Sequence, residues 1–141
     1  MREILFRGKR KDNGKWIEGA YLHLNVGRDY VCEGSVWIGT LQPYKEEVIS
    51  ETVGQYTGLT DKNGKKIFEG DIVRTSIPLS TDKYKNGVVM FGEYETMYHS
   101  GFIGFYVDWD FSQNLAVYCK MNDIEVIGNI HDNPELLKGS E

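Results

Sequence analysis

Short runs in which apolar and polar residues alternate cover most of the chain, and turn residues separate them. A period of two residues is typical of a β-strand with one buried face. One helical turn is predicted over residues 132–137, where Asn133 can cap the turn and Pro134 can take its first position. The strands predicted by the pattern cover residues 4–7, 16–24, 30–32, 35–39, 67–68, 72–73, 88–91, 102–109, 115–121 and 124–130.

Three Asn-Gly pairs interrupt these runs, beginning at Asn13, Asn63 and Asn86. Both residue types tolerate a positive φ, which the tight type I′ hairpin turn requires. The first pair predicts a hairpin between the first two strands, and the second predicts another compact hairpin. Their recurrence suggests two β-units with a boundary near residues 50–60.

The fold class that follows is all-β. Residues 1–55 are expected to form an N-terminal unit of hairpin and sheet. Residues 56–141 are expected to form an SH3-like, partly open β-barrel that ends in the short helical turn. Partial closure removes exposed strand edges, which suits a small chain this rich in strands. We expect the two units to pack as one compact domain.

Composition supports the strand assignment. Nine Tyr, six Phe and three Trp accompany 16 Gly, whereas Ala occurs only at Ala20 and Ala116. Each aromatic side chain can bury about 150–250 Å². A modest core is therefore attainable without a metal ion or a disulfide.

The charge distribution argues against binding to duplex nucleic acid. The net charge is −5, and residues 1–60 hold 8 basic and 8 acidic side chains. The excess of acid therefore lies in residues 61–141, with 13 acidic and 8 basic side chains. Phosphate binding usually needs a basic stripe. The single basic cluster is typical of a solvated hairpin tip, and it comprises Arg7, Lys9, Arg10 and Lys11.

The two cysteines, Cys32 and Cys119, are far apart and have no CxxC spacing. They are expected to be reduced thiols, as is usual in a cytosolic protein. The N-terminal residues do not resemble a signal sequence, and no apolar run approaches the length of a membrane span. We expect a soluble protein in the cytoplasm of a bacterial host, without membrane contact.

Carboxylates are the only candidates for catalysis. Asp108 and Asp110 flank Trp109 and project to the same side of a strand, where they could share a proton or hold a hard cation. A solvated strand face explains them as well. Asp71, after Gly70, could be a catalytic carboxylate, but an Asp there more often accepts backbone N–H groups at a strand entry.

No other constellation of catalytic or binding residues is found. The three histidines, His23, His99 and His131, have no metal-ligand spacing. The serines lack a nucleophile motif, and there is no phosphate-binding glycine loop. We therefore predict no catalytic, cofactor-binding or metal-binding residues.

Aromatic residues crowd the segment 94–109. Phe102, Phe105 and Trp109 are expected in the core. Exposed Tyr, Trp and Met are favoured at protein interfaces. The residues expected to contact a partner, because they lie in or near a loop, are Tyr94, Tyr98 and His99.

Four sequence motifs of this chain resemble the YopX family of phage and prophage proteins. The resemblance covers almost the whole chain and implies a mostly β protein encoded in phage or prophage genomes. It supplies no activity and no functional residues. The motifs are residues 2–7 (REILFR), 55–61 (QYTGLTD), 67–73 (IFEGDIV) and 124–130 (IEVIGNI).

These observations favour a non-catalytic accessory protein that binds another macromolecule. A protein is the favoured kind of partner, and self-association is left open. A nucleic-acid-binding β-barrel is the alternative, supported by the basic cluster and the aromatic residues on which bases could stack but disfavoured by the acidic charge. A small enzyme using the carboxylates is a second alternative.

Overall fold

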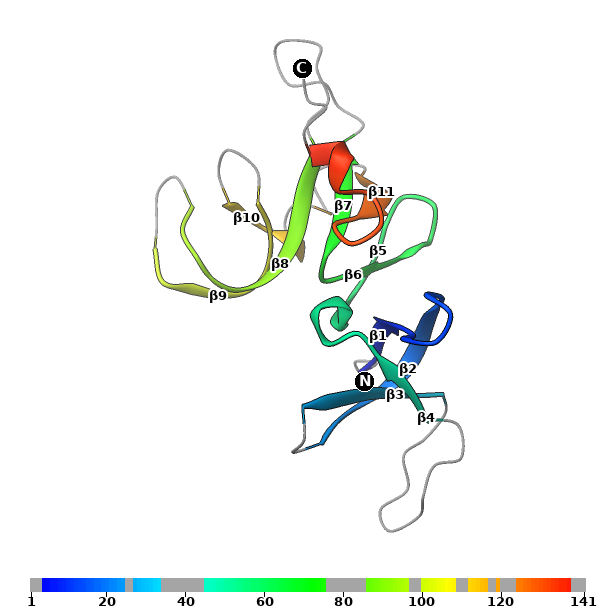
Figure 1. The fold of residues 1–141 in the computed structure, drawn as a ribbon. Coiled ribbons are helices and arrows are strands. Elements are labelled where there is room, and N and C mark those ends of the chain that lie inside the picture. Colours follow the sequence, from blue (N-terminus) through cyan, green and yellow to red (C-terminus); the bar gives the residue numbers. More distant parts are fainter. Residues whose placement is uncertain are drawn as a thin grey trace. The chain divides into compact units, whose positions relative to one another are not determined.

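The computed structural model describes residues 4–24, 27–33, 45–75, 86–96, 100–108, 112–116, 119 and 124–137. Within them, most elements are short strands, and the helical segments are single turns (Figure 1). The strand predicted at residues 35–39 lies outside the described residues. The elements are β1 (Phe6–Lys9), β2 (Trp16–Leu24), β3 (Arg28–Cys32), β4 (Lys45–Val48), η1 (Ser50–Thr52), β5 (Gly54–Thr60), β6 (Lys66–Phe68), β7 (Asp71–Thr75), β8 (Asn86–Tyr94), β9 (Phe102–Asp108), β10 (Ser112–Asn114), β11 (Ile124–Asn129) and η2 (Pro134–Leu137).

The chain divides into two compact units, Met1–Gly58 and Leu59–Glu141. Strand β5 begins in the first unit and ends in the second. The division predicted after residue 55, and the packing of both units as one domain, stay predictions.

The first unit is built on antiparallel strands in the order β4-β3-β2-β1-β5, and β6 follows β5 in the same sheet. The predicted hairpin between β1 and β2 is present, with Lys9 paired with Trp16. Its connection is longer than the tight two-residue turn, because Arg10 N donates to Lys15 O at 2.8 Å and Gly14 N to Arg10 O at 3.0 Å. Gly14 has a φ of 70°, and Asn13 Oδ1 accepts a hydrogen bond from Lys15 N at 2.9 Å. The local chemistry of the turn therefore sets the register of β1 against β2.

The core of the first unit is small. Ile17, Val31 and Val48 are buried together. A Cβ on Gly8 would lie 2.9 Å from the Val48 side chain, so glycine is what allows β1 to approach this valine. A few β-branched side chains thus fill the space under the sheet.

The second unit contains a five-stranded antiparallel sheet in the order β10-β9-β8-β7-β11. Strands β7 to β10 follow one another as a meander, and β11 returns to pair with β7. Valines on neighbouring strands face each other across it, as Val89 and Val107 do. The buried core side chains are Ile67, Val73, Val89, Val107, Leu115, Ile124 and Val126.

The prediction of an all-β protein is confirmed, since strands dominate the described residues and helical segments are short. The sheet of the second unit is not closed into a barrel in the part of the chain that the structure describes, because β10 and β11 are its two ends. The SH3-like assignment stays a prediction.

The strand predicted over residues 115–121 is wrong. Strand β10 ends at Asn114, and Leu115, Ala116 and Cys119 are helical. Leu115 is fully buried, and Cys119 packs against the same core. Residues four apart lie on one side of a strand and also on one side of a helix, so the pattern could not distinguish the two. Because the rise per residue is smaller in a helix than in a strand, the helical turn brings Leu115 and Cys119 closer together along its axis, so both reach the core.

The predicted C-terminal helical turn is present as η2. Leu136 N donates a hydrogen bond to Asn133 O at 3.1 Å. The Asn133 side chain instead accepts a hydrogen bond from Asn129 N at 3.3 Å. A Cβ on Gly128 would lie only 2.6 Å from Asn133 Oδ1. The Asn133 side chain therefore packs closely against the end of β11.

Candidate functional site

Strands β8 and β9 form a long hairpin that bends sharply (Figure 1). Gly92 and Gly104 face each other across it, with φ values of 150° and 157°. The Tyr94 ring stacks on the Tyr106 ring at a centroid distance of 4.8 Å. Tyr94 nevertheless pairs with Phe102, which in a straight strand lies about 13 Å from Tyr106. The hairpin therefore bends at the glycine pair, toward the side that carries these rings.

We call this side the inner face of the hairpin, defined by Tyr94, Phe102 and Tyr106. Tyr94 also stacks on Phe102 at 5.5 Å, and its hydroxyl accepts a hydrogen bond from Asn114 Nδ2 at 3.0 Å. Tyr94 is only 6% exposed. The bend encloses it, so Tyr94 is not the surface residue that its position near a loop predicts.

The other two residues of the predicted contact surface, Tyr98 and His99, lie outside the described residues. The opposite side of the hairpin, its outer face, is defined by Phe91, Glu93, Ile103 and Phe105. These residues form two cross-strand pairs, Phe91 with Phe105 and Glu93 with Ile103. Phe91 contacts Phe105 edge to face at a centroid distance of 4.9 Å, and Phe105 packs against the core.

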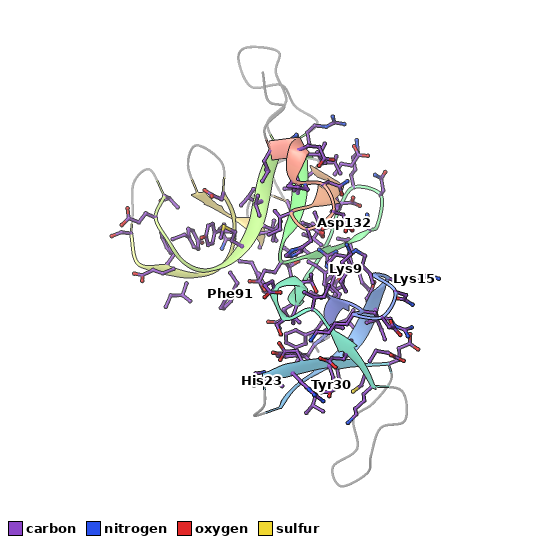
Figure 2. The ribbon with its side chains drawn as sticks, in the orientation of Figure 1. Lys9, Lys15, His23, Tyr30, Phe91 and Asp132 are labelled. Atoms are coloured by element: carbon purple, nitrogen blue, oxygen red, sulfur yellow. The ribbon has the colours of Figure 1, made fainter. Side chains whose placement is uncertain are left out.

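Exposed apolar side chains concentrate on this hairpin (Phe91 is labelled in Figure 2). Phe91 is 54% exposed and Ile103 is 77% exposed. Phe102, predicted as a core residue, is 40% exposed because it lies at the open end of the inner face. Trp109, also predicted in the core, lies outside the described residues. Of the seven large hydrophobic side chains exposed in the described residues, four belong to β8 and β9: Met90, Phe91, Phe102 and Ile103.

The candidate carboxylates do not form a cluster in the part of the chain that the structure describes. Asp71 is 1% exposed, and its Oδ2 accepts a hydrogen bond from Phe68 N at 2.8 Å. It therefore closes the turn before β7, in agreement with the interpretation that Asp71 accepts backbone N–H groups at a strand entry. Asp108 is exposed on β9 and shares a face with Val88 and Ile72, whereas Asp71 points to the opposite face. Asp110 lies outside the described residues.

A buried carboxylate that sequence analysis missed organises the second Asn-Gly turn. Asp61 Oδ1 accepts hydrogen bonds from Asn63 N and Lys65 N at 2.8 and 2.9 Å. Its Oδ2 accepts one from Val126 N at 3.0 Å. Burial alone would raise the pKa of Asp61, but the three N–H donors outweigh it and lower the pKa below its ordinary value. Asp61 thus ties the turn to β11.

A second unforeseen group joins β2 and β3 in the first unit, where His23 is labelled in Figure 2. His23 Nδ1 lies 2.5 Å from Asp29 Oδ1, and the Tyr21 hydroxyl donates to the same oxygen at 2.8 Å. Hydrogen bonds from the Ser50 side chain and from His23 lower the pKa of the buried Asp29 to about 2.

The pairing of β2 with β3 places His23 directly opposite Asp29. It was missed because the strand predicted from the pattern begins at Tyr30, whereas β3 begins at Arg28 and so includes Asp29. An ionised carboxylate in this position orients the imidazole ring. The same bonds also satisfy a buried charge, which is the simpler role.

Two residues of the basic cluster of the first unit, Arg10 and Lys11, form ion pairs with acidic neighbours. Arg10 forms ion pairs with Asp12 at 2.7 Å and with Glu46 at 3.2 Å. Lys11 forms one with Glu47 at 2.7 Å, which lowers the pKa of that carboxyl. Arg7 lies over the Trp16 ring, with its Cζ 4.7 Å from the ring centroid. Arg10 and Lys11 are thus each engaged by carboxylates of their own unit.

Two further observations concern only the described residues. Their His, Cys, Asp and Glu side chains nowhere gather in groups of three or more that could hold a metal ion. None of their helices has the length and apolar character needed to cross a membrane.

The fold and its bent hairpin define a class: an all-β protein of two antiparallel sheets with an apolar, partly exposed hairpin. The chain belongs to the YopX family, described as YopX protein, whose family model matches residues 5–138. The resemblance inferred from the four sequence motifs is thereby confirmed.

The comparison with solved structures finds a similar fold. The crystal structure of protein EF1440 from Enterococcus faecalis matches with a TM-score of 0.57 and 24% sequence identity, covering 97% of this chain and 99% of that chain. At this identity the likeness establishes the fold alone. The comparison with curated proteins finds no match.

Proposed function

We propose that this YopX-family chain is a phage or prophage accessory protein that acts without catalysis, by binding another protein through the outer face of the β8–β9 hairpin. The observation that carries the proposal is the exposure of Phe91 and Ile103, at 54% and 77%, on adjacent cross-strand pairs. Contiguous exposed apolar side chains mark interaction surfaces, and buried aromatic side chains supply much of the affinity at such surfaces.

The architecture of the second unit is consistent with this role. Its strand order, a meander whose last strand pairs with the first, is the order expected for the SH3-like barrel proposed from the sequence. Small β folds of this type carry their functions on grafted surface sites. A hairpin fixed by stacked rings on its inner face presents its outer face with little loss of conformational entropy on binding.

Charge favours a protein partner over a nucleic acid. The net charge is −5, and Arg10 and Lys11 are engaged by acidic side chains of their own unit. A nucleic acid would meet an acidic surface and lose the counterion release that drives such binding. The proposed site of action is the cytoplasm of a bacterial host.

Photo-crosslinking in a bacterial host tests the proposal. Ile103 is replaced by p-benzoylphenylalanine, and Ile4, which is 73% exposed in the first unit, is replaced in the same way as a matched control. We expect a covalent adduct with a discrete protein from position 103 and none from position 4. The same adducts from both positions, or none from position 103, would contradict the proposal.

A further inference from the structure

The charged side chains of the hairpin that carries the exposed apolar side chains are all acidic. Residues 86–119 contain four acidic side chains and neither Lys nor Arg. Three of the four acids are exposed in the structure, and they are Glu93, Glu95 and Asp108.

Asp108 projects from the same face as Tyr106, whereas Glu93 lies on the outer face beside the apolar side chains. Glu93 is paired directly with Ile103, so their side chains project from the same face. Glu95 comes two residues later, just after the end of β8. Phe91, on the adjacent pair, completes an apolar centre with carboxylates at its edge.

We propose that the partner bound by the outer face is a protein surface or peptide with apolar side chains at its centre and Lys or Arg side chains around them. This inference rests on the proposed function and specifies the chemistry of its partner. Complementary charge at the rim of an interface accelerates association and excludes wrong partners, while the desolvated apolar centre supplies most of the affinity.

The same charges disfavour the other occupants of this face. A second copy bound through the same face would place Glu93 against the partner copy's acidic rim, and like charges in an interface are destabilising. A nucleic acid or an anionic lipid surface would be repelled for the same reason. A basic, apolar protein surface is the occupant that both properties of the face favour.

The test uses the full chain and two synthetic peptides of equal length. One alternates leucine with lysine, and the other alternates leucine with glutamate. Binding is followed by fluorescence anisotropy at about 50 mM and about 300 mM NaCl, because screening weakens contacts between exposed charges. We expect the lysine peptide to bind, with affinity that falls several-fold at the higher salt, and the glutamate peptide not to bind.

Matched variants locate the binding. Ile103→Ser is expected to lower affinity for the lysine peptide about tenfold or more, and Ile4→Ser to leave it unchanged. Glu93→Gln is expected to lower affinity about two- to fivefold and to reduce its salt dependence. Glu51→Gln, at an exposed position in η1, is the control for a general loss of negative charge. Urea midpoints of all variants show that they remain folded.

Each outcome decides the inference. Equal binding of both peptides, or identical effects of Glu93→Gln and Glu51→Gln, would overturn the inferred basic partner while leaving an apolar contact surface intact. No binding of the lysine peptide, or no loss in Ile103→Ser, would also overturn it. Failure of the proposed function is distinguished separately, by the absence of a crosslinked protein at position 103.

Discussion

Gly92 and Gly104 lie directly opposite each other across the β8–β9 hairpin. Because neither residue of this pair has a side chain, the hairpin can bend here, and the Tyr94 ring reaches the Tyr106 ring. Glycine pairs covered by a neighbouring aromatic ring are a known means of curving a sheet. The bend encloses Tyr94, while Phe91 and Ile103 on the other face stay exposed.

Replacing a glycine of this pair should destabilise the protein through backbone strain alone. Gly104 has a φ of 157°, and a Cβ there would meet no atom within 4 Å. A backbone conformation that favours glycine costs a substituted residue about 1–3 kcal/mol. We expect Gly104→Ala to lower the free energy of unfolding by that amount in urea titrations. Thr60→Ala, at an exposed strand position, should change it much less, and equal effects would contradict the strain argument.

The hydrogen bond between Tyr94 and Asn114 should contribute measurably to stability. Tyr94 is buried and its hydroxyl accepts from Asn114 Nδ2 at 3.0 Å. Tyr94→Phe and Asn114→Ala should each lower the free energy of unfolding by about 1 kcal/mol. In the double variant the losses should fall short of their sum by about 0.5–1.5 kcal/mol. Strict additivity would show that the bond does not form in solution.

Asp61 should be a strong determinant of the stability of the second unit. It accepts backbone hydrogen bonds from both the Asn-Gly turn and Val126. Asp61→Ala leaves the buried Val126 N–H and the N–H groups of the turn without their acceptor, so we expect a loss of about 2–4 kcal/mol in the free energy of unfolding. Asp108→Ala removes an exposed carboxylate from the same unit and should cost less than about 0.5 kcal/mol. Similar losses from the two variants would refute this role.

Asp29 should make stability depend on pH in the acid range. Its pKa falls from 3.8 to about 2 on folding, so its ionised form is favoured by the native state. The stability that it contributes is therefore fully present above about pH 4 and is lost as the pH falls through about 2. In Asp29→Asn this contribution is absent.

Urea midpoints of wild type and Asp29→Asn, measured from about pH 6 down to about pH 2, check this expectation. The two midpoints should differ most above about pH 4 and converge as the pH falls. A difference between the two proteins that stays constant throughout the range would mean that the Asp29 carboxyl titrates alike in the folded and unfolded chain.

The strands and turns of the fold were largely predictable because they depend on neighbouring residues. Asn13 and Gly14 lie in the expected hairpin connection, which is longer than a two-residue turn, and the alternation at residues 16–24 gives β2 with the same bounds. The third Asn-Gly pair opens β8. Asn86 already pairs with Arg74 inside β8, since pairing with β7 overrides the local preference.

The candidate site was less predictable. The crowding of aromatic residues indicated the correct segment, but Tyr94 is enclosed and Phe102 is partly exposed. The alternation of side chains separates the two faces of a strand, yet it does not say which face becomes concave. That depends on the bend at Gly92 and Gly104, which face each other only once β8 and β9 have paired.

The sequence by itself determined the all-β class, the hairpin turns and the family, because periodicity, turn chemistry and motifs are properties of short segments. Only the tertiary structure decided the helical turn at Leu115, the pairing of His23 with Asp29 and the exposure of Ile103. These features arise where segments distant in the chain compete for the same core or lie across a strand pair. Their energies therefore depend on register and curvature, which no single segment encodes.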